Sequence, residues 1–123
     1  MRPLLITAAF ATLAGCMEPA TPVSAPASAA ITEEAAFRSA IVGKTLDFNG
    51  STFTVNANGT ISGPWDGSGI SGTWTWEDGA FCREGQVGAR VLELDCQTWA
   101  VNGNVATVTR DRGAGQSFDY TIS

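Results

Sequence analysis

Turn signals that contain glycine recur at short intervals along this chain, and each separates two runs rich in β-branched and aromatic residues. They are Asn49-Gly50, Ala57-Asn58-Gly59, Glu77-Asp78-Gly79 and Asn102-Gly103. Such signals are typical of β-hairpins, and the intervals are too short for the crossovers that parallel strands need. The sequence therefore predicts an antiparallel meander of about eight short strands. Pairing the last strand (117–122) with the first (44–48) would close it into a barrel without bare edges.

Two of these turns bear directly on strand register. A two-residue turn at Asn49-Gly50 places Leu46 opposite Phe53 on one face of its hairpin. After Asn102-Gly103 the register stays open, because two- and three-residue loops fit about equally well.

The segment around Glu77-Asp78-Gly79 holds two of the four tryptophans, Trp74 and Trp76. A three-residue loop ending in Gly79 sets Trp74 opposite Cys82, whereas a two-residue Asp-Gly turn sets Trp74 opposite Arg83. We expect the three-residue loop, because it brings Cys82 to the face of the tryptophans.

Cys96 is the expected disulfide partner of Cys82. In the run 92–96, Leu92, Leu94 and Cys96 alternate onto one apolar face, which leaves Asp95 on the solvated face. The sequence therefore predicts a Cys82–Cys96 disulfide packed beneath the tryptophans. In the chain-entropy model, closing a loop of about 15 residues contributes on the order of 3 kcal/mol to stability.

The N-terminus predicts export and lipid anchoring. One positive charge precedes a short apolar run that ends in Leu13-Ala-Gly-Cys16, which resembles the lipobox of bacterial lipoproteins. The resemblance implies a signal peptide over 1–15, acylation of Cys16 (palmitate), and attachment to the membrane through that lipid anchor. Met17 after the cysteine implies sorting to the outer membrane, with the domain in the periplasm.

Two segments follow the expected cleavage site. Residues 16–31 are rich in Pro and Ala, which predicts a disordered, lipid-anchored tether. Residues 32–123 are predicted to form a single β domain. We expect Thr32 to cap a short helix with Phe37 and Ile41 on its inward side, which plugs one end of the β-structure.

Charge and composition exclude several functions. The net charge is −5, and the basic residues are scattered, so no nucleic-acid partner is expected. There is no histidine, and all three cysteines are assigned to the disulfide or the lipid. We therefore expect no catalytic residues, no metal ligands and no cofactor.

Aromatic and basic side chains are the remaining candidates for a ligand or partner surface: Trp65, Trp74, Trp76, Arg110 and Arg112. Trp65 lies in a glycine-rich loop over 63–69, where it could line a ligand mouth or fold over an open end of the sheet. Arg110-Asp-Arg112 could hold an anion or be a charged turn that keeps an edge soluble.

Three motifs carry a family resemblance that covers most of residues 37–123. Gly72-Thr-Trp-x-Trp-Glu-Asp-Gly-x-Phe-Cys-Arg, Leu-Asp-Cys-Gln97 and Arg110-Asp-Arg-Gly-Ala-Gly resemble a family of small exported bacterial proteins of unassigned function. Some members carry the automated name dihydrodipicolinate reductase, which this chain does not support because it has no dinucleotide fingerprint and no room for a Rossmann domain. The architecture is also similar to that of periplasmic protease-inhibitor lipoproteins of the small β-barrel type.

These observations lead to three hypotheses. The first is a monomeric, non-enzymatic, lipid-anchored envelope protein that acts as a binding or structural module, with a periplasmic protein as a possible partner. The second is a protease inhibitor that inserts the tether or the helix into a protease cleft. The third, an enzyme, lacks any assembled set of acid, base, nucleophile or metal. A carrier would need a cavity, whereas we expect Trp74, Trp76, Phe53 and Leu94 to fill the interior.

Overall fold

The computed structural model describes residues 28–123. The predicted signal peptide, Cys16 and most of the predicted tether lie outside the described residues. The elements are β1 (Ala29–Ile31), α1 (Glu34–Ala40), β2 (Thr45–Phe48), β3 (Ser51–Val55), β4 (Thr60–Trp65), β5 (Ser68–Glu77), β6 (Ala80–Val87), β7 (Arg90–Asn102), β8 (Val105–Thr109), the single 3₁₀ turn η1 (Asp111–Gly113) and β9 (Ser117–Ile122).

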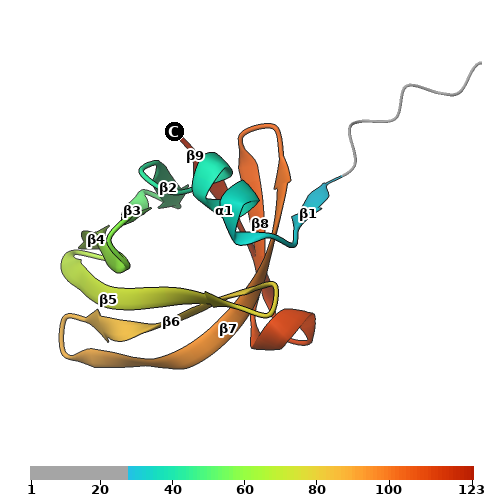
Figure 1. Ribbon diagram of the computed structural model, residues 1–123. Helices are drawn as coiled ribbons and strands as arrows, with labels where there is room; N and C mark the ends of the chain where they lie inside the picture. The colour runs from blue at the N-terminus through green and yellow to red at the C-terminus, as the bar shows by residue number, and fades with distance from the viewer. Residues whose placement is uncertain (1–27) are drawn as a thin grey trace, which may run out of the picture.

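Strands β2 to β9 form a closed antiparallel barrel of eight strands (Figure 1). Each strand pairs with its neighbours in the sequence, and β9 closes the ring by pairing with β2 as well as β8. The predicted meander, its closure and its lack of parallel pairs are confirmed. The ninth strand, β1, pairs with the end of β7, where Ala29 lies opposite Val101. Part of the segment assigned to the tether therefore belongs to the ordered domain.

Two hairpins show how the local sequence sets register. Asn49 and Gly50 both have positive φ, 51° and 87°, and Leu46 lies opposite Phe53 as predicted. Asn102 pairs with Val105, so the loop that the sequence left open has two residues.

The expected three-residue loop between β5 and β6 is wrong. Trp74 lies opposite Arg83 and Trp76 opposite Phe81, around a two-residue turn in which Asp78 and Gly79 have φ of 49° and 77°. A turn with two positive φ angles matches the right-handed twist of the flanking strands, which explains why Asp-Gly adopts it. As a result Phe81, and not Cys82, shares the inner face with the tryptophans.

The Cys82–Cys96 disulfide is present, but it lies on the outer face of the barrel. The two cysteines are directly opposite each other in the β6–β7 ladder, and Cys82 is opposite Thr75 on the other side. The predicted bond is confirmed, and its predicted place beneath the tryptophans is wrong.

A β-bulge in β7 changes which side chains face inward. Pairing passes from Arg83–Asp95 to Gly85–Leu92, so three steps along β7 match two steps along β6. Leu92 lines the interior, while Leu94 is 64% exposed and does not fill the core as expected. Asp95, expected on the solvated face, is half-buried.

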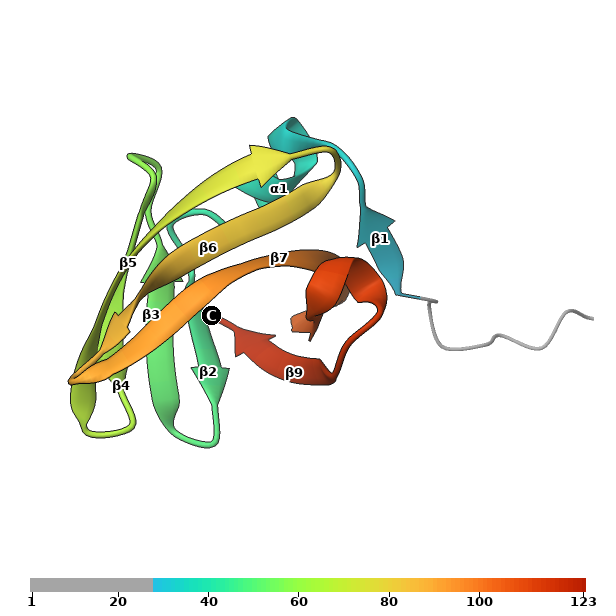
Figure 2. The same ribbon diagram turned by 90° about the horizontal axis from the view of Figure 1, so that it is seen from below.

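The helix closes one end of the barrel, as predicted (Figure 2). Phe37 is fully buried, and its ring centroid lies 5.0–5.5 Å from those of four aromatic residues, Trp74, Trp76, Phe81 and Trp99. The helix begins at Glu34 with Glu33 as N-cap and no side-chain capping bond, so the predicted cap at Thr32 is wrong. The aromatic cluster anchors the plug, because such pairs add roughly 0.5–1.5 kcal/mol each beyond area burial.

Candidate ligand-binding cavity

A cavity of about 580 Å³ occupies the barrel at the end opposite the helix plug. Its mouth lies among the β2–β3, β4–β5 and β6–β7 turns and the segment between β8 and β9, and its walls come from β2–β7 and β9. The expectation that the interior is filled is therefore wrong at this end. The reason is the plug: the largest side chains gather around Phe37 and leave the open half lined rather than filled.

One wall of the cavity is aromatic. Trp65 packs against Phe48, Phe53 and Tyr120, with ring centroids 6.4, 5.6 and 6.2 Å away. The glycine-rich loop predicted around Trp65 is instead a tight hairpin, in which Trp65 pairs with Ser68. Trp65 is one of the residues that line the cavity, and whether it contacts a ligand there stays a prediction.

The opposite wall is polar and is built around Asp95. The carboxylate accepts hydrogen bonds from Gln97 Nε2 at 2.9 Å, from Arg110 Nε at 3.2 Å and from the Asp111 amide at 3.0 Å. Arg83 Nη2 lies 3.9 Å from the same carboxylate, and Arg83 Nη1 donates to the Glu93 carbonyl at 2.7 Å. Three separate parts of the chain thus meet at one carboxylate.

Burial and charge act in opposite directions on these groups. Burial alone would raise the pKa of Asp95, but the hydrogen bonds from Gln97, the Asp111 amide and Arg110, together with the charge of Arg83, bring it below its ordinary value. Burial lowers the pKa of Arg83, and the attraction of Asp95 only partly offsets this. Burial also raises the pKa of Tyr120. Asp95 is therefore ionised and Tyr120 neutral at neutral pH.

Trp99 contributes an unsatisfied donor beside this wall. Its indole Nε1 is the one buried side-chain polar atom without a hydrogen-bond partner in the described part of the chain. Its ring lines the cavity and stacks on Tyr120 at 6.5 Å between centroids. A buried donor without an acceptor costs about 1–3 kcal/mol, so this indole N–H lowers the stability of the fold.

The five residues singled out from the sequence divide into two groups. Trp65 and Arg110 line the cavity, whereas Trp74, Trp76 and Arg112 do not. Trp74 donates its Nε1–H to the Asn56 carbonyl at 2.9 Å and packs with Trp76 around the helix plug, so both belong to the core. Arg112 is exposed on η1.

Sequence reasoning missed Arg83, Asp95 and Gln97. Arg83 was excluded from the inner face by the wrong turn length, and Asp95 by the unpredicted bulge. The signal that could have found Arg83 is Phe81: a register that buries this phenylalanine also turns Arg83 inward.

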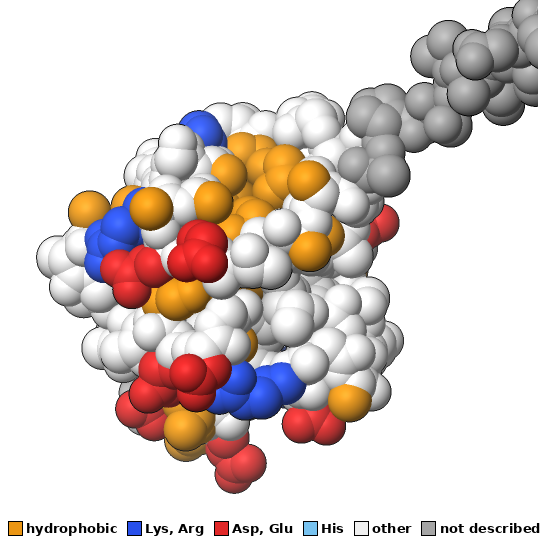
Figure 3. Space-filling model, turned by 45° about the vertical axis from the view of Figure 1, so that its right-hand side comes forward, with side chains coloured by type: hydrophobic (Ala, Val, Ile, Leu, Met, Phe, Trp, Pro, Cys, Tyr) orange, Lys and Arg blue, Asp and Glu red, His pale blue; other side chains and the backbone are white. Residues whose placement is uncertain are grey.

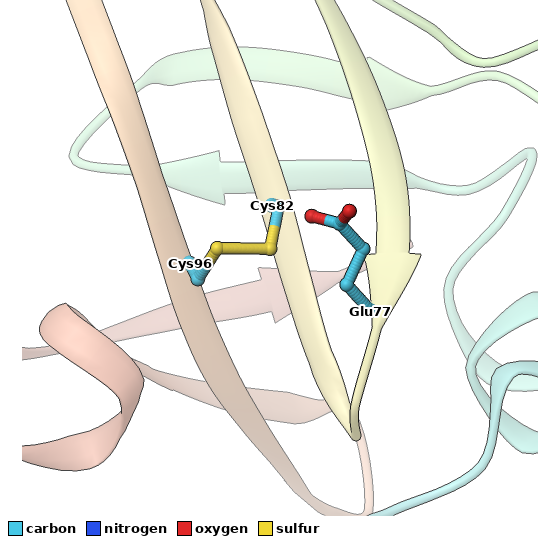
Figure 4. A group of neighbouring side chains, drawn as sticks. All are labelled: Glu77, Cys82 and Cys96. Carbon is cyan, nitrogen blue, oxygen red and sulfur yellow. A yellow bond between two sulfur atoms is a disulfide. The ribbon is translucent and has the colours of Figure 1, made fainter.

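A second group of side chains, Glu77, Cys82 and Cys96, lies on the outer face (Figure 4). The ligand atoms of these three residues lie within 4.8 Å of one another. Both sulfur atoms belong to the disulfide, so the group offers a carboxylate but no thiolate to a metal ion.

Comparison with known proteins adds no assignment: no family model, curated protein or solved structure matches this chain. Within residues 28–123, none of the helices has the length and apolar character required to span a bilayer. On the face seen in Figure 3, acidic and basic side chains lie beside one another, with hydrophobic side chains reaching the surface next to them.

Proposed function

We propose that this protein is a lipid-anchored envelope binding module that takes a small, largely apolar molecule into the open end of its barrel and does not transform it. The cavity carries this proposal. Its volume of about 580 Å³ lies within the range of about 300–1,000 Å³ typical of ligand sites. Eight-stranded barrels are just wide enough to hold one small ligand.

The ionisable groups at the cavity support binding over chemistry. A carboxylate whose pKa lies below its ordinary value is a weak base, and a tyrosine whose pKa is raised is a weak acid. Aromatic walls with a few convergent polar groups are typical of sites that hold and orient a ligand.

The helix is unsuited to the inhibitor alternative. Phe37 and Ile41 are fully buried, so α1 cannot enter a protease cleft without unplugging the barrel. The envelope location rests on the lipobox at Cys16. In cells that process lipoproteins, Cys16→Ser should move the protein from the membrane fraction to the soluble fraction, and continued membrane association would contradict the anchor.

Binding is tested with the fluorescent apolar probe N-phenyl-naphthylamine on the full chain carrying Cys16→Ser, so that acyl chains do not compete for the probe. Leu92→Trp places a larger ring in the cavity wall and should weaken probe binding about fivefold or more. Leu94→Trp is the matched control, because Leu94 lies two residues away on the outer surface. Equal binding by the two variants, or no binding to the unsubstituted cavity, would overturn the proposal.

A further inference from the structure

The polar wall of the cavity carries more positive than negative charge. Two guanidinium groups, Arg83 and Arg110, share the single carboxylate of Asp95, at 3.9 and 3.2 Å. The remaining charged residues in the lining, Arg90 and Glu93, cancel each other. The lining therefore carries three arginines and one carboxylate, Glu93. Counting Asp95, which holds the two arginines without itself lining the cavity, the net charge at this wall is about +1 in a protein whose net charge is −5.

Most of the N–H donors on these two arginines are unused within the described residues. A guanidinium carries five donors in a planar fork. Arg110 donates only through Nε, and Arg83 only through Nη1, to a neutral carbonyl. Asp95 already accepts three hydrogen bonds and has little capacity for the remaining donors.

Because the Arg83 guanidinium is mostly buried, its unused N–H donors favour binding of an anion. The Arg83 side chain is 13% exposed, so water reaches it poorly, and burial lowers its pKa. A buried cation that is only partly compensated is stabilised by any anion that reaches it. The Arg110 side chain is 50% exposed and lies at the mouth, where it can meet an incoming anion first.

We infer that the ligand is a small monocarboxylate with an aromatic or branched apolar body. Its carboxylate binds the free edges of the Arg83 and Arg110 guanidiniums, and its body lies against the aromatic wall formed by Trp65 and Tyr120. A net charge of about one favours a monoanion over a phosphate dianion, and a planar fork matches the geometry of a carboxylate. The inference rests on the proposed binding function and specifies the chemistry of its ligand.

The test compares naphthylacetate with its uncharged isostere naphthylacetamide, each titrated calorimetrically into the full chain carrying Cys16→Ser. We expect the carboxylate to bind at least about tenfold more tightly than the amide, because hydrogen bonds to charged groups are the stronger ones. Arg110→Gln should remove most of this preference. Arg112→Gln, the same change of charge two residues away on an exposed turn, should retain it.

The remaining outcomes of this experiment distinguish a failure of the monocarboxylate inference from a failure of the proposed binding function. Equal affinity for carboxylate and amide would overturn the monocarboxylate inference and leave the binding function standing. The same would follow if Arg112→Gln abolished the preference as fully as Arg110→Gln, because the effect would then be general attraction and not contact in the cavity. Failure of both compounds and of N-phenyl-naphthylamine would overturn both proposals.

Discussion

Replacing Asp95 by Asn should weaken the fold and strengthen ligand binding at the same time. Asparagine keeps one acceptor oxygen but loses the charge, so at least one of the charge-assisted hydrogen bonds from Gln97 and the Asp111 amide, of about 1.5–3 kcal/mol, disappears. The pair with half-exposed Arg110 adds only about 0–1 kcal/mol. We expect a loss of about 2–3 kcal/mol in the free energy of unfolding at neutral pH, or roughly 10–20 °C in Tm for a domain of this size.

The loss should depend on pH in a defined direction. Because the folded-state pKa of Asp95 is lowered, its contribution is present above the unfolded pKa of about 3.9 and disappears as pH falls through the folded pKa. Urea denaturation at neutral and acidic pH should therefore show a large difference between Asp95→Asn and the unsubstituted chain at neutral pH and a smaller one in acid. Asp119→Asn, which removes an exposed carboxylate on β9, is the control and should change stability little.

Binding provides the second half of this prediction. Removing Asp95 leaves Arg83 and Arg110 without their carboxylate, so naphthylacetate should bind more tightly to Asp95→Asn, while naphthylacetamide is little affected. A variant with unchanged stability at neutral pH would refute the role of Asp95 in the fold. Weaker binding of the carboxylate by a folded variant would refute the assignment of the two arginines to the anion.

Three further changes test the fold. Replacing Cys82 and Cys96 together by Ala should lower the free energy of unfolding by about 3 kcal/mol if the disulfide stabilises the fold through loop closure in the denatured chain. Dithiothreitol should not change the Tm of this variant, because the variant has no disulfide between these strands. Gly85→Ala should unfold or severely destabilise the domain, because a Cβ there would collide with the Ser71 carbonyl of β5; normal thermal denaturation would contradict that packing. Phe37→Ala should cost about 3–5 kcal/mol and loosen the plug, measured by urea denaturation, and a cost below about 1 kcal/mol would show that the helix is not anchored through this ring.

The barrel could be predicted from the sequence because its turns are local. Asn49-Gly50 favours positive φ at both positions, and that preference alone sets the register of Leu46 against Phe53. When such turns repeat along a chain without crossovers, the strands form an antiparallel meander. Strand β9, with its alternating pattern, then pairs with β2 and closes the barrel.

The register of β5 and β6 could not be predicted correctly because a false premise outweighed the local signal. We assumed that a disulfide lies on the apolar face and therefore placed Cys82 with the tryptophans. The same choice would have turned Phe81 outward, and burying a phenylalanine contributes about 1.5–3 kcal/mol. In the structure Phe81 is buried in the barrel, and the disulfide joins β6 and β7 on the outer face. A disulfide there constrains the denatured chain as much as one on the inner face would, because the closed loop has the same length.

The polar wall of the cavity was hidden from the sequence for a different reason. Under strict alternation Leu92 and Asp95 must face opposite sides, and only the bulge in β7 turns both inward. No glycine or proline at positions 93 and 94 marks the bulge, and near it two large hydrophobic side chains, Val91 and Leu94, are left on the surface. Because Asp95 holds Arg110 and lies beside Arg83, the irregularity that exposes one leucine also assembles the charged wall, which a regular ladder would have left divided between the two faces of the sheet.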